Sequence, residues 1–247
     1  MEKKHFTVVI PAYNCSDWVE KNLSSVLSQE YDNYDVVYID DASTDDTLEK
    51  VKRIYSSSSK EFKVISNNVN VKALKNLYTH IKQAQDESII ITLDGDDFLS
   101  DDNVLAYLNT LYQDDDCWLT VGSYIQNDNY QVITPSDVDS KYWNSNIRNQ
   151  PWSFSHLRTF RKKLFDKISL KDLLDSDGNF FSFTFDRAMM YPMVEMAGPD
   201  HVTLVKKVLY IYNRLNPISV DRVHRMEQLR IESVIRKMRP YERLEEL

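Results

Sequence analysis

The sequence predicts an α/β protein, a three-layer α/β/α sandwich built around a mostly parallel central sheet. Three observations support this prediction. Short apolar runs rich in Val and Ile alternate with segments whose apolar residues recur every three or four positions. Several of these runs end at Pro or Asp, residue types that favour turns. The chain has 247 residues, of which 42% are hydrophobic and 28% charged, enough for one large domain with a buried core.

The N-terminal half is expected to follow the order β-α-β-α-β-α-β. Strands are predicted at 6–10, 36–39, 62–65 and 89–93, and helices at 16–29, from residue 45 or 46, and from residue 70. Pro11 ends the first strand, and Ser16 is expected to cap the first helix. This alternation implies right-handed crossovers and a Rossmann-like sheet whose ligands bind beyond the carboxyl ends of its strands.

The C-terminal half has a looser pattern and is expected to be smaller. A helix near 101–113 and a strand near 118–124 precede a polar stretch at 125–150, for which we predict loops and short hairpins. The predicted elements that follow are helices at 183–197 and 220–238 and strands near 202–205 and 208–212. We find no internal repeat, and predict one domain, residues 1–247, whose halves 1–125 and 126–247 differ in role.

Composition excludes several classes of function. With four glycines standing far apart, the chain has no Gly-rich phosphate loop of the dinucleotide-binding or P-loop type. Residues 1–150 hold 13 basic and 25 acidic side chains, whereas residues 201–247 hold 10 and 6. An acidic first half argues against nucleic acid as a partner, because nucleic-acid binding requires a basic face. A carboxylate-rich half suits a hard divalent cation instead.

The cysteines and the N-terminal residues indicate where the protein works. Cys15 and Cys117 are too few for a disulfide framework and lack C-x-x-C spacing, which favours a reducing compartment. The apolar run near the N-terminus is too short for a signal sequence, and no apolar stretch of about 18 residues occurs. We therefore expect a soluble, cytoplasmic protein.

Two acidic clusters follow predicted strands at the same edge of the sheet. Asp94, Asp96 and Asp97 come directly after an apolar strand, where three neighbouring carboxylates repel one another. Mn²⁺ or Mg²⁺ would neutralise them, although a turn leading into a helix N-cap also explains Asp and Gly here. The second cluster begins with Asp40 and Asp41, a pair that helix capping does not require.

Three linked motifs resemble the family-2 glycosyltransferases with the GT-A fold, in order and in spacing. They are VVIPAYN at 8–14, YIDDASTDDT at 38–47 and TLDGDD at 92–97. The segment NVNVKALKNL at 68–77 is similar to the family's N-x-G…RN segment, with its glycine replaced and Lys75 where arginine is usual. Asn70 tolerates a positive φ, so we expect the turn to persist there.

The resemblance implies transfer of a sugar from a nucleotide diphosphate sugar, commonly a UDP-sugar, to an acceptor hydroxyl. It places Pro11, Ala12 and Tyr13 around the uridine, with Asp41, or else Asp40, on the base. In the D-x-D motif it places Asp94 near the ribose, followed by Gly95, and Asp96 and Asp97 on the metal, Mn²⁺ or Mg²⁺. Lys72 or Lys75 would add positive charge near the diphosphate, with a solvated helix lysine as the alternative.

The resemblance also implies an inverting mechanism, in which a carboxylate near the start of a helix accepts the proton of the acceptor. Asp186 occupies that place, with Glu195, Asp175 and Asp177 as alternatives. On the acceptor side we expect an aromatic and polar pocket. Its candidate residues, which are Trp152, His156 and Arg158, have core packing as the alternative role. The segment 210–219 resembles the family's Y-x-Y-R-x-H-x-x-S ending, with Asn216 in place of histidine.

Other functions and partners remain open at this point. A non-catalytic nucleotide-sugar or glycan-binding module of the same fold is the main alternative. A sugar-1-phosphate nucleotidyltransferase would need a Gly-rich loop after Ile10, and a phosphotransferase an aspartate at the end of the first strand; neither is present. The last predicted helix carries Val220, Val223, Met226, Ile231, Val234, Ile235 and Met238 on an approximate stripe. Its basic residues suggest contact with a membrane surface or a second copy. The acceptor is a glycan, a lipid or a protein.

Overall fold

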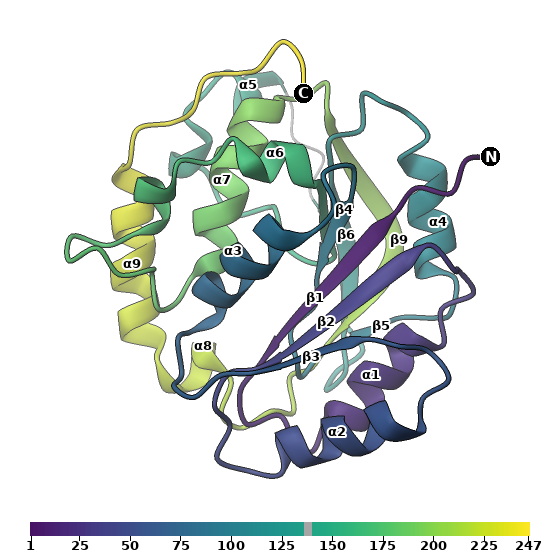
Figure 1. Cartoon of the computed structure of the whole chain (residues 1–247). Coiled ribbons are helices and arrows are strands. Elements are labelled where there is room, and N and C mark those ends of the chain that lie inside the picture. Colours follow the sequence, from purple (N-terminus) through teal and green to yellow (C-terminus); the bar gives the residue numbers. More distant parts are fainter. Residues whose placement is uncertain (136–139) are drawn as a thin grey trace.

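A nine-stranded mixed sheet forms the centre of this computed structural model, which describes residues 1–135 and 140–247 (Figure 1). The strand order is β3-β2-β1-β4-β8-β6-β9-β5, and β7 pairs with β6. The strands are β1 (Phe6–Ala12), β2 (Tyr34–Asp40), β3 (Lys63–Ser66), β4 (Ile89–Thr92), β5 (Phe98–Leu99), β6 (Leu119–Gln126), β7 (Val132–Ile133), β8 (Arg158–Arg161) and β9 (Val202–Tyr212).

The N-terminal half has the predicted alternation, and its strands β1 to β4 pair in parallel. Its helices are α1 (Val19–Leu27), α2 (Thr47–Ser57), α3 (Ala73–Gln83) and α4 (Val104–Leu111). The later helices are α5 (Ser140–Trp143), α6 (Lys162–Asp166), α7 (Phe185–Ala197), α8 (Val220–Val223) and α9 (Arg225–Lys237), with 3₁₀ turns η1 (Ile147–Asn149) and η2 (Leu170–Leu173).

Two apolar cores, one on each face of the sheet, produce the three predicted layers. Successive side chains of a strand point to opposite faces. Val8 and Ile10 of β1 accordingly lie in one core with α1 and α4, whereas Val9 lies in the other with α3, α6 and α7. Figure 1 shows α3, α6, α7 and α9 on one side of the sheet and α1, α2 and α4 on the other.

The C-terminal half enters the sheet in a way that the sequence pattern did not indicate. Strand β8 inserts antiparallel between β4 and β6, and β9 is one continuous strand, parallel to β6, where two were expected. The sequence of β8 is Arg-Thr-Phe-Arg, and a four-residue segment flanked by charges lacks the apolar run of a buried strand. The sheet as a whole is therefore mixed.

Three local expectations were wrong. The N-cap of α1 is Trp18 rather than Ser16, and the backbone N–H of Ser16 donates to Asp45 Oδ2 at 3.1 Å. The positive φ in the turn before α3 falls on Lys72 (φ 71°), not on Asn70. The single long C-terminal helix is divided into α8 and α9.

The stripe predicted for that last helix is also divided between two environments. Ile231 and Ile235 are buried against the core, with 4% and 1% of their surface exposed. Val223, Met226 and Val234 are exposed instead. Val223 lies in α8. An α-helix repeats every 3.6 residues, so within α9 the exposed Met226 and Val234 lie on a different face from the buried Ile231 and Ile235. The helix therefore has an inner and an outer apolar face.

Both cysteines are free and buried, in agreement with the expectation that they form no disulfide framework. No helix in the described ranges is both long enough and apolar enough to cross a membrane.

Candidate active site

The two acidic clusters are both attached to the carboxyl end of β1. The backbone N–H of Gly95 donates to the Pro11 carbonyl at 3.2 Å, and that of Asp41 donates to the Ala12 carbonyl at 2.8 Å. A Cβ atom on Gly95 would lie 2.5 Å from the Cβ of Ala12, so only glycine allows this approach. The end of β1 therefore holds the D-x-D loop and the Asp40–Asp41 pair side by side, as predicted.

A buried asparagine on α1 fixes the D-x-D loop from the other side. Asn22 Nδ2 donates to the carbonyls of Asp94 and Asp97, at 3.0 and 2.8 Å. Its side chain is fully buried. Backbone carbonyls that leave a strand need such partners when buried, and here one amide satisfies two of them. No sequence pattern distinguishes Asn22 from the other polar positions of α1.

Asp97 lies inside the protein and links the loop to the end of β9. It is 1% exposed, and its carboxylate accepts hydrogen bonds from the Tyr210 hydroxyl at 2.5 Å and the Asn213 backbone N–H at 2.6 Å. Burial, together with the carboxylates of Asp96 and Asp94, raises the pKa of Asp97 well above its usual range. Asp97 thus fixes the segment that follows β9.

Asp96 is partly exposed and meets the residue that stands in place of the family's histidine. Asn216 Nδ2 donates to Asp96 Oδ2 at 2.6 Å. The amide of Asn216 therefore reaches the acidic cluster from the segment beyond β9, 120 residues along the chain. The amide oxygen of Asn216 accepts the backbone N–H of Ile218 at 3.1 Å, so it is the amide nitrogen, which is not a metal ligand, that faces Asp96.

Arg158 lies between two carboxylates from distant parts of the chain. Its Nη2 is 3.7 Å from Asp94 Oδ2, and its Nη1 is 3.8 Å from Asp186 Oδ2. The β8–β4 register explains this position, because Arg158 pairs with Thr92, two residues before Asp94. The guanidinium is buried, and its Nε and Nη2 have no hydrogen-bond partner among the described residues. Buried donors normally have partners, so this arginine is suited to binding an anionic or hydroxyl-rich ligand.

The pKa values of Asp94 and His156, two members of this cluster, are both shifted from their usual ranges. Burial raises the pKa of Asp94 to about 6, opposed by Arg158 and reinforced by the carboxylates of Asp96 and Asp186. Burial also lowers the pKa of His156 well below its usual range, as does the Arg158 charge, so the imidazole is neutral. The His156 ring stacks on Tyr210, with 4.4 Å between centroids.

The donor set fits a divalent cation. One ligand atom each from Asp94, Asp97 and His156 lies within 4.8 Å of the others, and Asp96 and Asn216 adjoin them. Arg158 is in ion-pair contact with Asp94 and Asp186, and the carboxylates of Asp96 and Asp97 lie close to Asp94. Mn²⁺ and Mg²⁺ favour such oxygen-rich sites.

The Asp40–Asp41 pair divides into two roles. Both oxygens of Asp41 accept protein hydrogen bonds, from Asn67 Nδ2 at 2.8 Å and from the backbone N–H groups of Val71 and Lys72 at 2.9 and 2.8 Å. Asp40 is also buried, but its Oδ1 has no partner among the residues described. Asp41 therefore holds the turn before α3, whereas Asp40 retains an unused oxygen.

The other candidates differ in how near they lie to this cluster. Asp186 is in the first turn of α7, in ion-pair contact with Arg158. Tyr13 is 42% exposed beyond β1, and Lys75 is exposed on α3. Trp152 packs against Tyr191, with 5.2 Å between ring centroids, beside the core that contains α3, α6 and α7. This contact agrees with core packing, the alternative role given for Trp152.

Two of the alternative base candidates have structural partners. Glu195 is buried in a two-point ion pair with Arg148, at 2.6 and 2.8 Å, and cannot reach an acceptor. Asp175 accepts the backbone N–H groups of Asp177 and Asn179 and so closes a turn. Asp177 itself is exposed.

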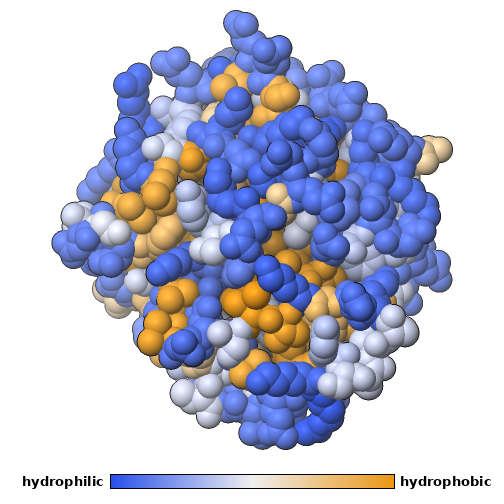
Figure 2. Space-filling view, viewed as in Figure 1, coloured by the Kyte–Doolittle hydropathy of each residue, from blue (hydrophilic) through white to orange (hydrophobic). Residues whose placement is uncertain are grey.

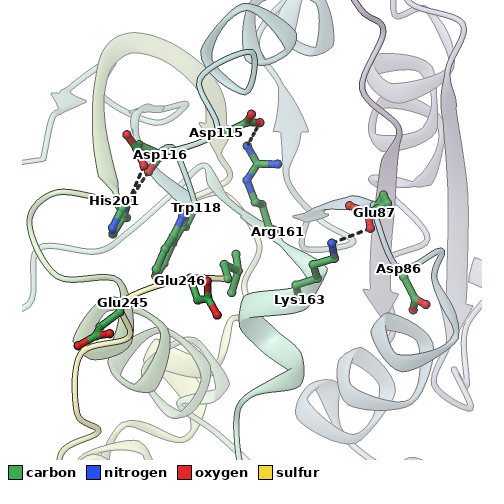
Figure 3. A pocket seen from close by; sticks show the side chains of 11 residues that line it. Asp86, Glu87, Asp115, Asp116, Trp118, Arg161, Lys163, His201, Glu245 and Glu246 are labelled. Atoms are coloured by element: carbon green, nitrogen blue, oxygen red, sulfur yellow. Dashed lines mark hydrogen bonds and ion pairs between the residues drawn. The ribbon is translucent and has the colours of Figure 1, made fainter.

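A separate cavity of about 330 Å³ lies where β4, β6 and β9 begin, the end of these strands opposite the D-x-D loop. Figure 3 shows Arg161 directed toward Asp115 and Lys163 directed toward Glu87. The opposite charges within each pair neutralise each other. None of the predicted site residues lines this cavity.

Comparison with known proteins agrees with this geometry. The model of the family described as "Glycosyl transferase family 2" matches residues 7–174, more than half of the chain. The putative glycosyltransferase EpsE of Bacillus subtilis is 34% identical over 91 residues, 37% of this chain and 32% of EpsE. The chondroitin synthase of Escherichia coli is 31% identical over 108 residues, 44% of this chain and 15% of that protein. The chain thus spans a third or less of these relatives.

Solved structures share the fold at low sequence identity. Residues 1–349 of S. aureus TarS in complex with UDP-GlcNAc superpose with a TM-score of 0.67 at 18% identity, covering 94% of this chain and 66% of that one. The mannosyltransferase PcManGT from Pyrobaculum calidifontis, in complex with GDP-Man and Mn²⁺, superposes with a TM-score of 0.66 at 18% identity, covering 97% and 66%. The predicted GT-A fold is confirmed.

Proposed function

The chain belongs to glycosyl transferase family 2, and on that basis we propose that it transfers a hexose from a UDP-sugar to an acceptor hydroxyl, with inversion and with a divalent metal. The fold neighbours in complex with UDP-GlcNAc and GDP-Man support a nucleotide-sugar donor. The acidic cluster at the carboxyl edge of the sheet supports the metal.

The donor is proposed to lie along the ends of β1, β2 and β4. Pro11, Ala12 and Tyr13 would contact the uridine. Asp40 is favoured over Asp41 as the partner of the uracil ring, because Asp40 has a buried oxygen without a partner among the described residues. A ligand N–H would give that oxygen its missing hydrogen bond. Lys72 stands nearer to the site than Lys75, since its backbone N–H binds Asp41 and its ammonium approaches the Phe183 ring.

Asp96 and Asp97 are proposed to hold Mn²⁺ or Mg²⁺, as the resemblance implies, with Asp94 beside the ribose. Asp97 is the member that this pair shares with the group whose ligand atoms lie within 4.8 Å of one another, which is Asp94, Asp97 and His156. Asp96 is the more accessible of the two, because both oxygens of Asp97 already accept hydrogen bonds from the β9 segment. When bound, the cation would supply Lewis-acid stabilisation of the charge on the departing diphosphate.

Asp186 is proposed as the base, which requires a carboxylate that is ionised and close to the acceptor hydroxyl. The observation that carries the proposal is the position of Arg158 between Asp94 and Asp186, which brings the D-x-D loop and the start of α7 into one site. Arg158 Nη1 lies 3.8 Å from Asp186 Oδ2, so this ion pair holds the Asp186 carboxylate on the side of the D-x-D loop. His156 and Arg158 would line the acceptor side.

The test compares Asp186→Asn with Asp177→Asn, an exposed aspartate in the loop before α7. Asp186→Asn should bind UDP and Mn²⁺ with unchanged affinity while losing at least 100-fold in transfer rate, as expected for a general base. Asp177→Asn should transfer at the unmutated rate. Equal rates for all three proteins would refute the assignment. Metal-dependent binding without transfer or donor hydrolysis in the unmutated chain would favour the non-catalytic binding module.

Several finer predictions stay open within this proposal. A cytoplasmic location is still expected from the two free cysteines. The acceptor is proposed to be a glycan, a lipid or a protein, as expected from the sequence. Contact of the C-terminal helix with a membrane or a second copy is likewise a prediction from the sequence.

A further inference from the structure

Exposed apolar side chains are concentrated on α8, α9 and the segment before them. Of the thirteen large hydrophobic residues exposed in the described ranges, six fall between 215 and 234. We call them the α8–α9 face: Leu215, Ile218, Val223, Met226, Leu229 and Val234. Figure 2 shows apolar side chains over α8 and along α9, interleaved with hydrophilic ones. An apolar group of this kind on a protein surface commonly marks an interaction site.

The outer face of α9 is amphipathic in its own right. Six exposed residues follow the i, i+3, i+4 spacing of one helix face. They are Met226, Leu229, Arg230, Ser233, Val234 and Lys237. Met226 is 80% exposed, whereas Ile231 on the opposite face is 4% exposed. The inner face already accounts for the packing of the helix, so the outer apolar residues have no role in the core.

The charge around the α8–α9 face is opposite to that of the protein as a whole. The chain carries a net charge of −8, yet residues 214–239 hold seven basic and three acidic side chains. Arg222, Arg225, Arg230 and Lys237 are exposed among the apolar residues. A second copy of this chain would bring the same positive charges to a two-fold interface, where they repel. An anionic surface complements them.

The α8–α9 face is joined directly to the candidate active site. Asn216, between Leu215 and Ile218, donates to Asp96 at 2.6 Å. The Phe183 ring stacks on His224 at 4.8 Å between centroids, and Thr184 Oγ1 donates to the Gln228 carbonyl at 3.1 Å. Residues next to the metal candidate and residues just before Asp186 therefore both adjoin this face.

We propose that the α8–α9 face docks on an anionic lipid bilayer, with the apolar side chains of Met226 and its neighbours inserted between the headgroups and the arginines on the phosphates. Interfacial helices combine apolar anchors with Lys and Arg in this way. Docking would place the site at the membrane surface. If the chain is the transferase proposed above, on which this step rests, a site held at the membrane surface would act on a lipid-linked acceptor.

The experiment is co-sedimentation of the full chain, without donor, with vesicles of equal parts phosphatidylcholine and phosphatidylglycerol, and with vesicles of phosphatidylcholine alone. Binding is expected to the anionic vesicles and to weaken in high salt, which screens exposed charges. Each basic side chain near an anionic surface strengthens binding about five-fold, so Arg222→Gln with Arg225→Gln should weaken it about 25-fold. Lys52→Gln with Arg53→Gln, on exposed positions of α2, is the matched control.

The apolar contribution is tested with a matched pair of leucines. Leu229 and Leu170 are 41% and 42% exposed, and only Leu229 lies on the α8–α9 face. Leu229→Ser should weaken vesicle binding, the addition of Met226→Ser should bring the loss to at least ten-fold, and Leu170→Ser, the control for Leu229→Ser, should leave binding unchanged. All are surface changes, and thermal unfolding of each variant verifies folding.

Three outcomes would overturn the proposal. They are absence of binding to the anionic vesicles, equal binding to neutral vesicles, and a dimer in solution that the same substitutions abolish without any vesicle binding. The last would identify the face as a protein interface. UDP binding with Mn²⁺ is measured separately in solution, so failure of the membrane inference and failure of the proposed transferase activity are distinguishable.

Discussion

Lys72 occupies a backbone conformation that favours glycine, and Lys72→Gly should stabilise the protein. Its φ of 71° and ψ of 161° fall in a region that is almost restricted to glycine. A side chain there costs about 1–3 kcal/mol. Glycine would remove that cost but lose about 0.5–1 kcal/mol through the greater freedom of the unfolded chain. We expect a net gain of about 1 kcal/mol, which raises Tm by about 2–4 °C in a protein of this size.

The structure also explains why the strain persists. The turn at 71–72 presents two successive backbone N–H groups to Asp41, at 2.9 and 2.8 Å. A buried carboxylate needs such donors, and losing them costs more than the strain of one residue. Glycine at 72 keeps both N–H groups, so UDP binding should change only through the lost ammonium.

Thermal and urea unfolding of Lys72→Gly and Lys72→Ala separate the backbone from the charge. Both variants remove the ammonium, which lies 5.9 Å from the Phe183 ring centroid, but alanine retains the strain. Lys72→Gly should therefore be more stable than Lys72→Ala by about 1 kcal/mol or more. If the two variants unfold at the same denaturant concentration, the strain assigned to Lys72 is absent and the reasoning fails.

Three further substitutions examine the site and the core. Gly95→Ala would force its Cβ to 2.5 Å from that of Ala12, so we expect a loss of about 1–3 kcal/mol in unfolding free energy and at least ten-fold weaker UDP binding in a titration. Arg148→Met would leave the buried carboxyl group of Glu195 without its ion-pair partner, and should cost about 3–5 kcal/mol of unfolding free energy in urea, most of it recovered when Glu195→Met is added. Arg158→Lys keeps the positive charge but loses the planar guanidinium group with its several N–H donors. The transfer rate should fall at least ten-fold, while UDP binding with Mn²⁺ persists. Transfer at the unmutated rate would contradict a role for the Nε and Nη2 groups of Arg158, which have no hydrogen-bond partner among the described residues.

The parallel half of the fold was predictable because its strands are apolar and each ends in a turn signal. Val8, Val9 and Ile10 form such a run, although β1 continues through Pro11, where the strand was expected to stop, and ends at Ala12. Strand β8 was not predictable in the same way. Its two arginines interrupt any apolar pattern, and its place in the sheet comes from pairing with β4 and β6, which a local pattern does not contain.

The site divides along the same line. The D-x-D loop and the Asp40–Asp41 pair were found because both follow predicted strands, and parallel strands present their carboxyl ends at one edge. Asn22, Asn67 and Asn213 were missed. Asparagines are common in turns and on helices, and their roles here depend on contacts with residues far along the chain. Asp186 was identified by its place in a resemblance, and its contact with Arg158 became visible only in three dimensions.

The scarcity of glycine shows which of glycine's two properties this site requires. At Lys72, and also at Ala42 with φ of 60°, a side chain is carried at positive φ. At Gly95 the backbone φ is unexceptional, but a Cβ would meet the backbone of Ala12 at 2.9 Å. Positive φ raises the energy of one residue by a limited amount, whereas a collision between two backbones has no local relief. The site therefore tolerates side chains at Ala42 and Lys72, where only φ is demanding, and retains glycine where β1 and the D-x-D loop must touch.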